Sequence, residues 1–127
     1  MSKDTVLVVE DDQLLREVIE DLLQIYQIKV KTVGSSIEAD AWLEAHIPDI
    51  IICDLFLPTE SGIQWLNKVS DRLIKSNSSV ILLSADHQRT DEMLKDGPIY
   101  PLVKHQLIKP FKNDELVRLI NLLQVNT

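Results

Sequence analysis

The sequence predicts an α/β domain built on a five-stranded parallel sheet with helices on both faces. Short apolar runs, each typical of a buried strand, alternate along the chain with longer segments in which apolar residues recur at helical spacing. The run from Ile50 to Cys53 is apolar without interruption, as expected for a parallel strand covered on both faces. Right-handed crossover connections then place helices on both sides of the sheet.

The first half of the chain supplies two strands and two helices before this central run. Thr5 to Val9 is a β-rich run that predicts the first strand. An amphipathic helix follows from Gln13 to about Tyr26. Val30 to Val33 alternates apolar and polar residues like a half-exposed strand, and the turn after it leads into a helix over Ile37 to His46, which ends before Pro48.

The second half continues the alternation. Apolar residues from Ile63 to Ile74 predict one further helix, and Val80 to Leu83 is a short buried strand. The segment from Asp86 to Gly97 is strongly polar, so any helix in it is short and weakly anchored. The last strand is predicted near Gln106 to Ile108, and the last helix begins at Asn113, where a cap and two acidic residues favour a helix start.

The carboxyl ends of these strands should all meet at one edge of the sheet, where ligands bind in open α/β folds. The residues expected at this edge end or directly follow the predicted strands. They are Glu10, Asp11 and Asp12 from the first strand, Asp54 from the third, Ser84 from the fourth and Lys109 from the fifth. Crowded carboxylates repel each other unless a cation joins them, and oxygen ligands with open positions suit Mg²⁺.

A Mg²⁺ site of this kind commonly binds a phosphate group in addition to one or two carboxylates. Lys109 offers a positive charge to a phosphoryl oxygen, and Ser84 offers a hydroxyl. Asp54 is then either a metal ligand only or also a nucleophile that accepts the phosphoryl group. The residues alone leave both roles open.

Four motifs in this order resemble the receiver domain of response regulators. They are the paired acids after the first strand, Asp-Leu-x-Leu-Pro-x-x-x-Gly from Asp54, Ser-Ala from Ser84 and Lys-Pro-Phe from Lys109. The resemblance covers about residues 4 to 124. It implies a flavodoxin-like fold with strand order 2-1-3-4-5 and a phospho-accepting switch of a two-component or phosphorelay system.

The resemblance also implies a role for each residue of the acidic group. Asp54 is the phospho-acceptor, and Asp11 with Glu10 forms an acidic pocket for Mg²⁺. The metal also takes Asp54 and the backbone carbonyl of Phe56. Asp12 borders the pocket as a further candidate ligand.

The remaining motif residues match groups that contact the phosphoryl group. Ser84 matches the switch hydroxyl, and Lys109 matches the lysine that contacts the phosphoryl oxygens. A cis Lys109–Pro110 bond is implied as well. One position departs from the pattern, because Gln106 stands where the family usually has an aromatic residue that moves with the switch hydroxyl.

The partners implied by the resemblance are proteins. A sensor histidine kinase or a histidine phosphotransfer protein donates the phosphoryl group. A downstream protein or a fused output domain reads the changed surface, and activation can bring about homodimerisation. The chain itself would be a regulatory phospho-acceptor, not an enzyme, although it assists its own phosphorylation and dephosphorylation.

Two other functions stay open. The first is a pseudo-receiver, in which the fold serves as a protein-interaction module without phosphorylation. Gln106 at the usual aromatic position leaves this hypothesis open. A small metal-dependent phosphohydrolase is disfavoured, because Phe56 stands where such an enzyme would need a carboxylate as general acid and base.

Length and composition set further expectations. The 127 residues fit a single domain with no output domain, either a stand-alone regulator or the receiver of a longer protein. The net charge of −7 opposes direct binding to nucleic acid or an anionic membrane. Without a signal peptide or a long apolar span, the expected location is the cytoplasm. Cys53 lies inside an apolar run and is predicted to be a core residue.

Overall fold

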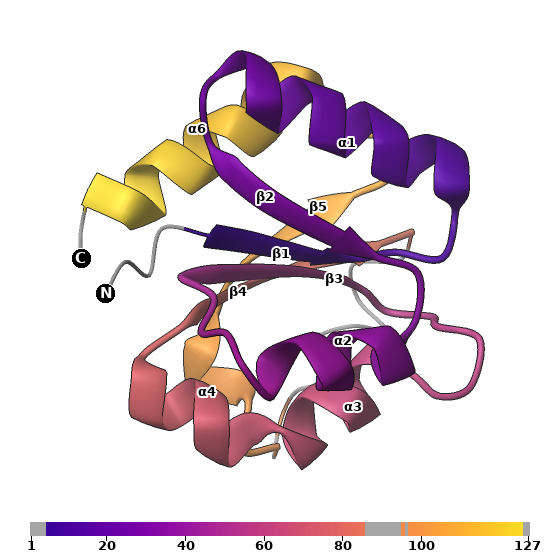
Figure 1. The fold of residues 1–127 in the computed structure, drawn as a ribbon, viewed down its shortest axis with the longest axis vertical. Coiled ribbons are helices and arrows are strands. Elements are labelled where there is room, and N and C mark those ends of the chain that lie inside the picture. Colours follow the sequence, from indigo (N-terminus) through magenta and orange to yellow (C-terminus); the bar gives the residue numbers. More distant parts are fainter. Residues whose placement is uncertain (1–4, 86–94, 96, 126–127) are drawn as a thin grey trace.

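A computed structural model describes residues 5–85, 95 and 97–125. Five parallel strands form one sheet in the order β2-β1-β3-β4-β5 (Figure 1), which confirms the flavodoxin-like fold. The strands are β1 (Thr5–Val9), β2 (Lys29–Val33), β3 (Ile50–Asp54), β4 (Ser79–Ser84) and β5 (Val103–Ile108). The helices are α1 (Gln13–Ile25), α2 (Ser36–Leu43), α3 (Gly62–Lys68), α4 (Ser70–Ser76) and α6 (Asn113–Val125), with a 3-10 turn, η1, at Tyr100–Leu102.

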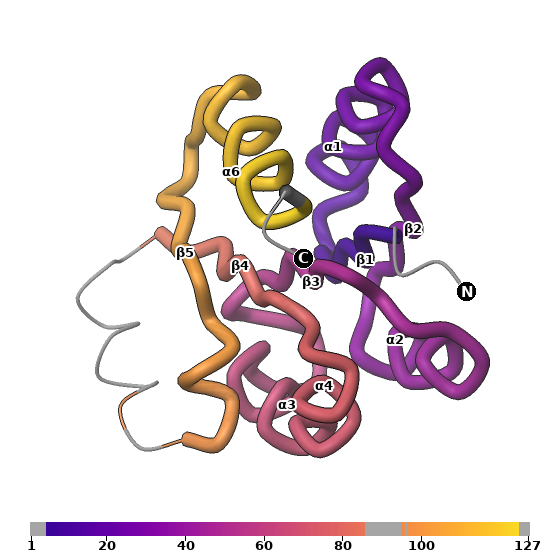
Figure 2. The backbone as a smooth tube through the Cα atoms, turned by 90° about the vertical axis from the view of Figure 1, so that its left-hand side faces the viewer, coloured from indigo at the N-terminus to yellow at the C-terminus, as the bar shows by residue number. Residues whose placement is uncertain are grey.

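Helices cover both faces of the sheet and enclose two apolar layers. α1 and α6 lie on one face, and α2, α3 and α4 lie on the other (Figure 1, Figure 2). Because successive side chains of a strand point to opposite faces, Leu7 and Ile51 belong to the layer under α2, α3 and α4, whereas Val8 and Ile52 belong to the layer under α1 and α6. All four side chains are 0% exposed, as expected for strands covered on both sides.

The register of the strands brings their carboxyl ends to one edge. Asp54 at the end of β3 lies opposite Leu83, the residue before Ser84. Ser84 lies opposite Ile108, the residue before Lys109. Chemistry-bearing residues from the third, fourth and fifth strands are therefore neighbours in space.

The single helix predicted over Ile63 to Ile74 is two helices in the structure, α3 and α4, so that prediction is wrong. The break is at Val69, whose backbone angles (φ −99°, ψ 10°) leave the helical region. Beside it, the Ser70 hydroxyl donates a hydrogen bond to the Asn67 carbonyl (2.8 Å). A serine hydroxyl that binds a nearby carbonyl competes with the helical backbone, which accounts for a break within a continuous apolar pattern.

The helix predicted over Ile37 to His46 is α2, and it ends three residues early, at Leu43. The Trp42 carbonyl accepts a hydrogen bond from the Ala45 N–H (3.2 Å), which tightens the last turn. His46 Nδ1 also lies 3.0 Å from that carbonyl oxygen. These contacts satisfy a terminal carbonyl that a longer helix would have used.

The last strand is longer than the predicted Gln106 to Ile108, which forms only the second half of β5. Val103 is followed by Lys104 and His105, so no apolar run marks the start of the strand. Among the described strands, β5 pairs only with β4. An edge position tolerates such polar residues because one side of the strand has no neighbouring strand.

The prediction that Cys53 is a core residue is confirmed. Cys53 is 0% exposed in the core, and burial raises the pKa of its thiol. Trp65 is 1% exposed, and its indole N–H donates to Asp40 Oδ1 (2.8 Å). Most of the polar segment from Asp86 to Gly97 lies outside the described residues. Within the described part of the chain, no helix combines the length and hydropathy that crossing a bilayer requires.

Candidate functional site

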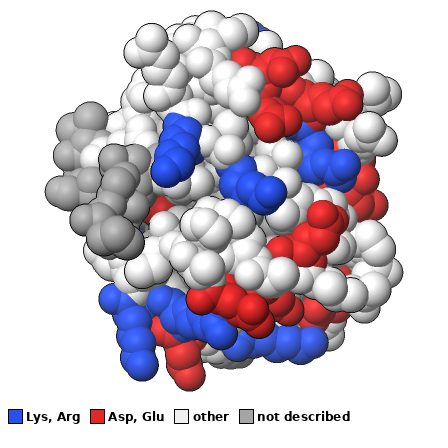
Figure 3. Space-filling model, viewed as in Figure 1, with Lys and Arg blue, Asp and Glu red and all other residues white. Residues whose placement is uncertain are grey.

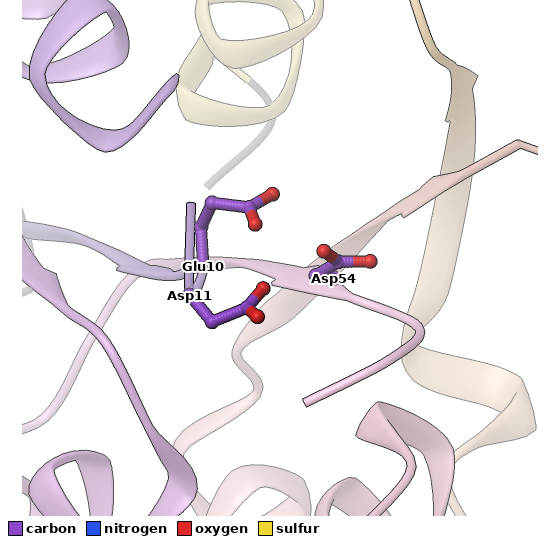
Figure 4. A group of neighbouring side chains, drawn as sticks. All are labelled: Glu10, Asp11 and Asp54. Carbon is purple, nitrogen blue, oxygen red and sulfur yellow. The ribbon is translucent and has the colours of Figure 1, made fainter. Parts of the chain in front are cut away.

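Three carboxylates converge at the edge of the sheet where the strands end (Figure 4). Glu10 and Asp11 follow β1, and Asp54 ends β3. Each of them offers one carboxylate oxygen within a group whose atoms all lie within 4.8 Å of one another. Glu10 is 0% exposed and Asp54 only 6%, whereas Asp11 is exposed and opens the group to solvent. The structure thus brings together three of the residues predicted to bind metal.

Lys109 joins this acidic pocket from the end of β5. Its Nζ lies 2.9 Å from Glu10 Oε1 and 2.9 Å from Asp54 Oδ2. Burial would lower the pKa of Lys109, but its hydrogen bonds to the two carboxylates outweigh that effect and raise the pKa. Lys109 therefore keeps its positive charge between the two buried carboxylates.

Burial makes the ionisation of Glu10 costly. Burial raises its pKa from 4.5 to about 7, against hydrogen bonds from the Asp12 N–H and from Lys109 that lower it. The proximity of Asp54 adds to the increase. Such a carboxyl exchanges a proton for a cation near neutral pH.

Two residues stabilise the backbone between β1 and α1. They are Arg16 of α1 and Asp12, which caps this helix. The Arg16 guanidinium donates to the Glu10 carbonyl (2.9 Å). Asp12 caps α1, because its Oδ1 accepts hydrogen bonds from the N–H groups of Leu14 (3.0 Å) and Leu15 (3.4 Å). The Asp12 side chain is therefore engaged with the helix, and its role as a metal ligand stays a prediction.

The loop between β3 and α3 folds back onto Asp54. The Phe56 N–H donates to Asp54 Oδ1 (3.2 Å), and the Phe56 ring is 55% exposed beside it. The Gly62 N–H donates to the Leu55 carbonyl (2.6 Å). A Cβ atom at position 62 would collide with the Asp54 carbonyl oxygen, so only glycine permits this approach.

Ser84 and Lys109 lie side by side on adjacent strands. The Lys109 N–H donates to the Ser84 carbonyl (2.8 Å), and Ser84 is only 3% exposed. The Lys109–Pro110 bond is cis, as the sequence predicted. The arrangement places one buried hydroxyl residue beside the residue whose ammonium group reaches Asp54.

Two residues at this edge carry no signal in the sequence. Arg16 lies among other charged residues on an amphipathic helix, and a solvated arginine would give the same pattern. Glu60 lies in the loop before α3 and pairs with Lys68 (2.7 Å). Neither contact follows from spacing, because each joins separate elements.

The chemistry of this donor set fits a hard divalent cation. Carboxylate oxygens from two strand ends lie close together, and one side of the group is open to solvent. Magnesium is commonly held by one or two carboxylates while it keeps several waters. Asp11 lies on the side of the group that solvent reaches.

Comparison with known proteins identifies the family. The family model for the response regulator receiver domain matches residues 6–121. The chain is 33% identical over 112 residues to the virulence transcriptional regulatory protein PhoP of Salmonella choleraesuis. This match covers 88% of this chain and 48% of PhoP. It is 32% identical over 123 residues to hybrid signal transduction histidine kinase D of Dictyostelium discoideum, covering 96% of this chain and 8% of the kinase.

Solved structures agree with these matches. The receiver domain of the Francisella response regulator 1452 superposes with a TM-score of 0.81 at 28% identity, covering 97% of this chain and 98% of that domain. The chain therefore matches nearly the whole of that receiver domain but less than half of the two curated relatives, 48% and 8% of their lengths.

Proposed function

The chain belongs to the receiver domain family of response regulators in two-component signalling, and on that basis we propose that it is a phospho-accepting switch. The observation that carries the proposal is the placement of Asp54. Its carboxylate ends the central strand, lies 2.9 Å from Lys109 and belongs to a three-carboxylate group able to hold a metal.

In the proposed reaction, one Asp54 oxygen attacks the phosphorus of a phosphohistidine. A new P–O bond forms, the P–N bond breaks, and the departing imidazole takes up a proton. The transferred group carries negative charge on its three outer oxygens. Lys109 would neutralise part of that charge, and the Ser84 hydroxyl would donate a hydrogen bond to it.

We propose Mg²⁺ as the cofactor of this step. Glu10, Asp11 and Asp54 would hold it, with the Phe56 carbonyl as a backbone ligand and Asp12 at the border of the pocket. When bound, the cation neutralises charge on the acceptor and on the phosphoryl oxygens. The raised pKa of Glu10 supports this assignment, because a cation would replace the proton that burial otherwise favours.

We propose a sensor histidine kinase or a histidine phosphotransfer protein as the donor. The surface next to the pocket is suited to a protein partner, because α1 exposes Leu14 (74%), Val18 (51%) and Ile25 (74%). A groove of about 450 Å³ runs from this helix to Lys109. Acidic side chains also gather over α1 (Figure 3), so a partner with complementary positive charge would be favoured.

The direct test is intact mass after incubation with acetyl phosphate, a small phosphoryl donor. We expect one phosphoryl group on the parent protein with Mg²⁺ and none without it. Asp54→Asn should take up none, whereas Asp71→Asn, which changes an exposed acid on α4, should behave like the parent. The adduct should be released by hydroxylamine, as expected for an acyl phosphate.

The opposite result would favour the pseudo-receiver. That outcome is a parent protein that is folded by circular dichroism, takes up no phosphoryl group and is not trapped by beryllofluoride. Labelling that persists in Asp54→Asn would instead move the acceptor to another residue.

A further inference from the structure

The loop between β3 and α3 contains an acidic side chain that the proposed phosphoryl chemistry does not use. The Glu60 side chain is only 17% exposed, and its two oxygens contact different helices. Oε1, which is shielded from solvent, lies 2.7 Å from Lys68 Nζ in α3. Oε2 accepts a hydrogen bond from the Ser36 hydroxyl at the start of α2 (3.0 Å). Both contacts favour the ionised carboxylate.

The backbone of the same loop is closed on itself. The Glu60 carbonyl accepts a hydrogen bond from the Leu57 N–H (3.2 Å). Phe56 and Ser61 form an antiparallel bridge, and the Phe56 N–H donates to Asp54 Oδ1 (3.2 Å). These contacts connect the backbone at Glu60 and Ser61 with the backbone at Phe56 and Leu57.

A carboxylate withdrawn from water keeps its position because losing its partners is costly. Ser36 is 1% exposed and is fixed in the first turn of α2, so one oxygen of Glu60 has a rigid partner. Lys68 holds the other oxygen from α3. Partners on two helices define where the loop lies before any ligand binds, and such preorganisation lowers the cost of binding.

We propose that Glu60 is a positioning residue for the metal site. It clamps the β3–α3 loop against α2 and α3, and thereby holds the Phe56 carbonyl in place as a ligand. This inference rests on the proposed function, since it requires Mg²⁺ in the acidic pocket. Groups that orient metal ligands without touching the metal commonly contribute about tenfold or more to affinity.

The test compares Mg²⁺ affinity in two variants by isothermal titration calorimetry. Glu60→Met removes both contacts while keeping side-chain length, and we expect its Mg²⁺ Kd to rise about tenfold. Glu60→Gln keeps an acceptor for Ser36 and should show a smaller rise. The rate of acetyl phosphate labelling at saturating Mg²⁺ should stay within about twofold of the parent, since a positioning role for the metal affects binding more than the transfer step.

The matched control is Glu38→Met. Glu38 lies in α2, and its Oε1 accepts a hydrogen bond from the Gly34 N–H (3.1 Å) at the start of this helix. Neither residue belongs to the β3–α3 loop. We expect its Mg²⁺ Kd to match the parent. If Glu60→Met fails to fold, Lys68→Met replaces it, because Lys68 is 69% exposed and tolerates change; its Kd should rise by about threefold or more.

Three outcomes would overturn the clamp. The first is a Mg²⁺ Kd equal to that of the parent in Glu60→Met, or in Lys68→Met where that variant replaces it. The second is a rise in the Mg²⁺ Kd of Glu38→Met as large as that of Glu60→Met. The third is a lower labelling rate of Glu60→Met that persists at saturating Mg²⁺. If the parent itself binds no Mg²⁺, the metal in the proposed function fails and the clamp fails with it. If the parent binds Mg²⁺ and is labelled while the variants match it, the clamp alone fails.

Discussion

The charges of the pocket balance only when a cation is present. Ionised Glu10, Asp11 and Asp54 together carry three negative charges, and Lys109 supplies one positive charge. The remaining two charges match a divalent ion. Without it, the pocket must hold a proton or keep the repulsion, and the raised pKa of Glu10 is consistent with partial protonation of this carboxyl near neutral pH.

The pH dependence of metal binding follows from that pKa. A carboxyl raised from 4.5 to about 7 stabilises the metal-free fold through its proton below about pH 4.5, and this contribution is lost as the pH rises through about 7. Mg²⁺ requires the ionised form and competes with the same proton. Its affinity should therefore increase about tenfold from about pH 6 to about pH 8.

The measurement is Mg²⁺ titration of the parent and of Glu10→Gln at both pH values. The variant lacks the titrating group, so its weaker affinity should change by less than about twofold. A variant with the same pH dependence as the parent would show that another group controls binding.

Individual site residues could be predicted from the sequence only where strand ends fix their position. Glu10, Asp54 and Lys109 follow apolar runs directly, so the parallel sheet brings them together. Arg16 and Glu60 could not be found in this way. Their partners, a backbone carbonyl and a hydroxyl on another helix, depend on how elements pack.

At the scale of elements, the junction of β3 and α3 depends on Gly62. A methyl group there would meet the Asp54 carbonyl oxygen and lie 3.0 Å from Cys53 Sγ, so α3 would have to move away from the strand. We expect Gly62→Ala to lower the free energy of unfolding by about 1–3 kcal/mol, as overpacking does in tight interiors. Urea unfolding measures this, and acetyl phosphate labelling should slow because the loop is displaced.

Gly34→Ala is the control for this substitution. Its added methyl group would lie 2.7 Å from Nη1 of Arg16, at the end of a long side chain; the shift of this side chain weakens its hydrogen bond to the Glu10 carbonyl but requires no movement of backbone. The cost should stay below about 1 kcal/mol. Equal losses in the two variants would mean that the close approach to Asp54 is not what requires glycine at position 62.

The boundaries of elements were predicted less well than their existence. Apolar periodicity, turn residues and caps located the segments that form the α-helices, but periodicity missed the break at Val69, because the Ser70 hydroxyl that competes there leaves the apolar pattern unchanged. The start of β5 was missed for a different reason. An edge strand does not need an apolar run, so Lys104 and His105 concealed it.

At the scale of the whole molecule, the sheet connects the two apolar layers. Burial on both faces made the fold class predictable, because a strand buried on both sides is apolar at every position. The strand order needed the family resemblance, since periodicity does not say which strands are neighbours. A shared sheet also has a thermodynamic consequence, because neither layer of helices can keep its core if the strands separate.

We therefore expect the chain to unfold as one cooperative unit. Trp42 and Trp65 both lie on the face covered by α2, α3 and α4, so their fluorescence reports that layer, whereas far-UV circular dichroism counts helices on both faces. Leu23→Ala truncates a 0% exposed side chain of α1, which covers the opposite face of the sheet, and should cost about 2–5 kcal/mol. In urea, the fluorescence and dichroism midpoints should coincide in the parent and shift together in the variant. A fluorescence midpoint that stays at the parent value would show that the two layers unfold independently, and the single-domain prediction would then be wrong.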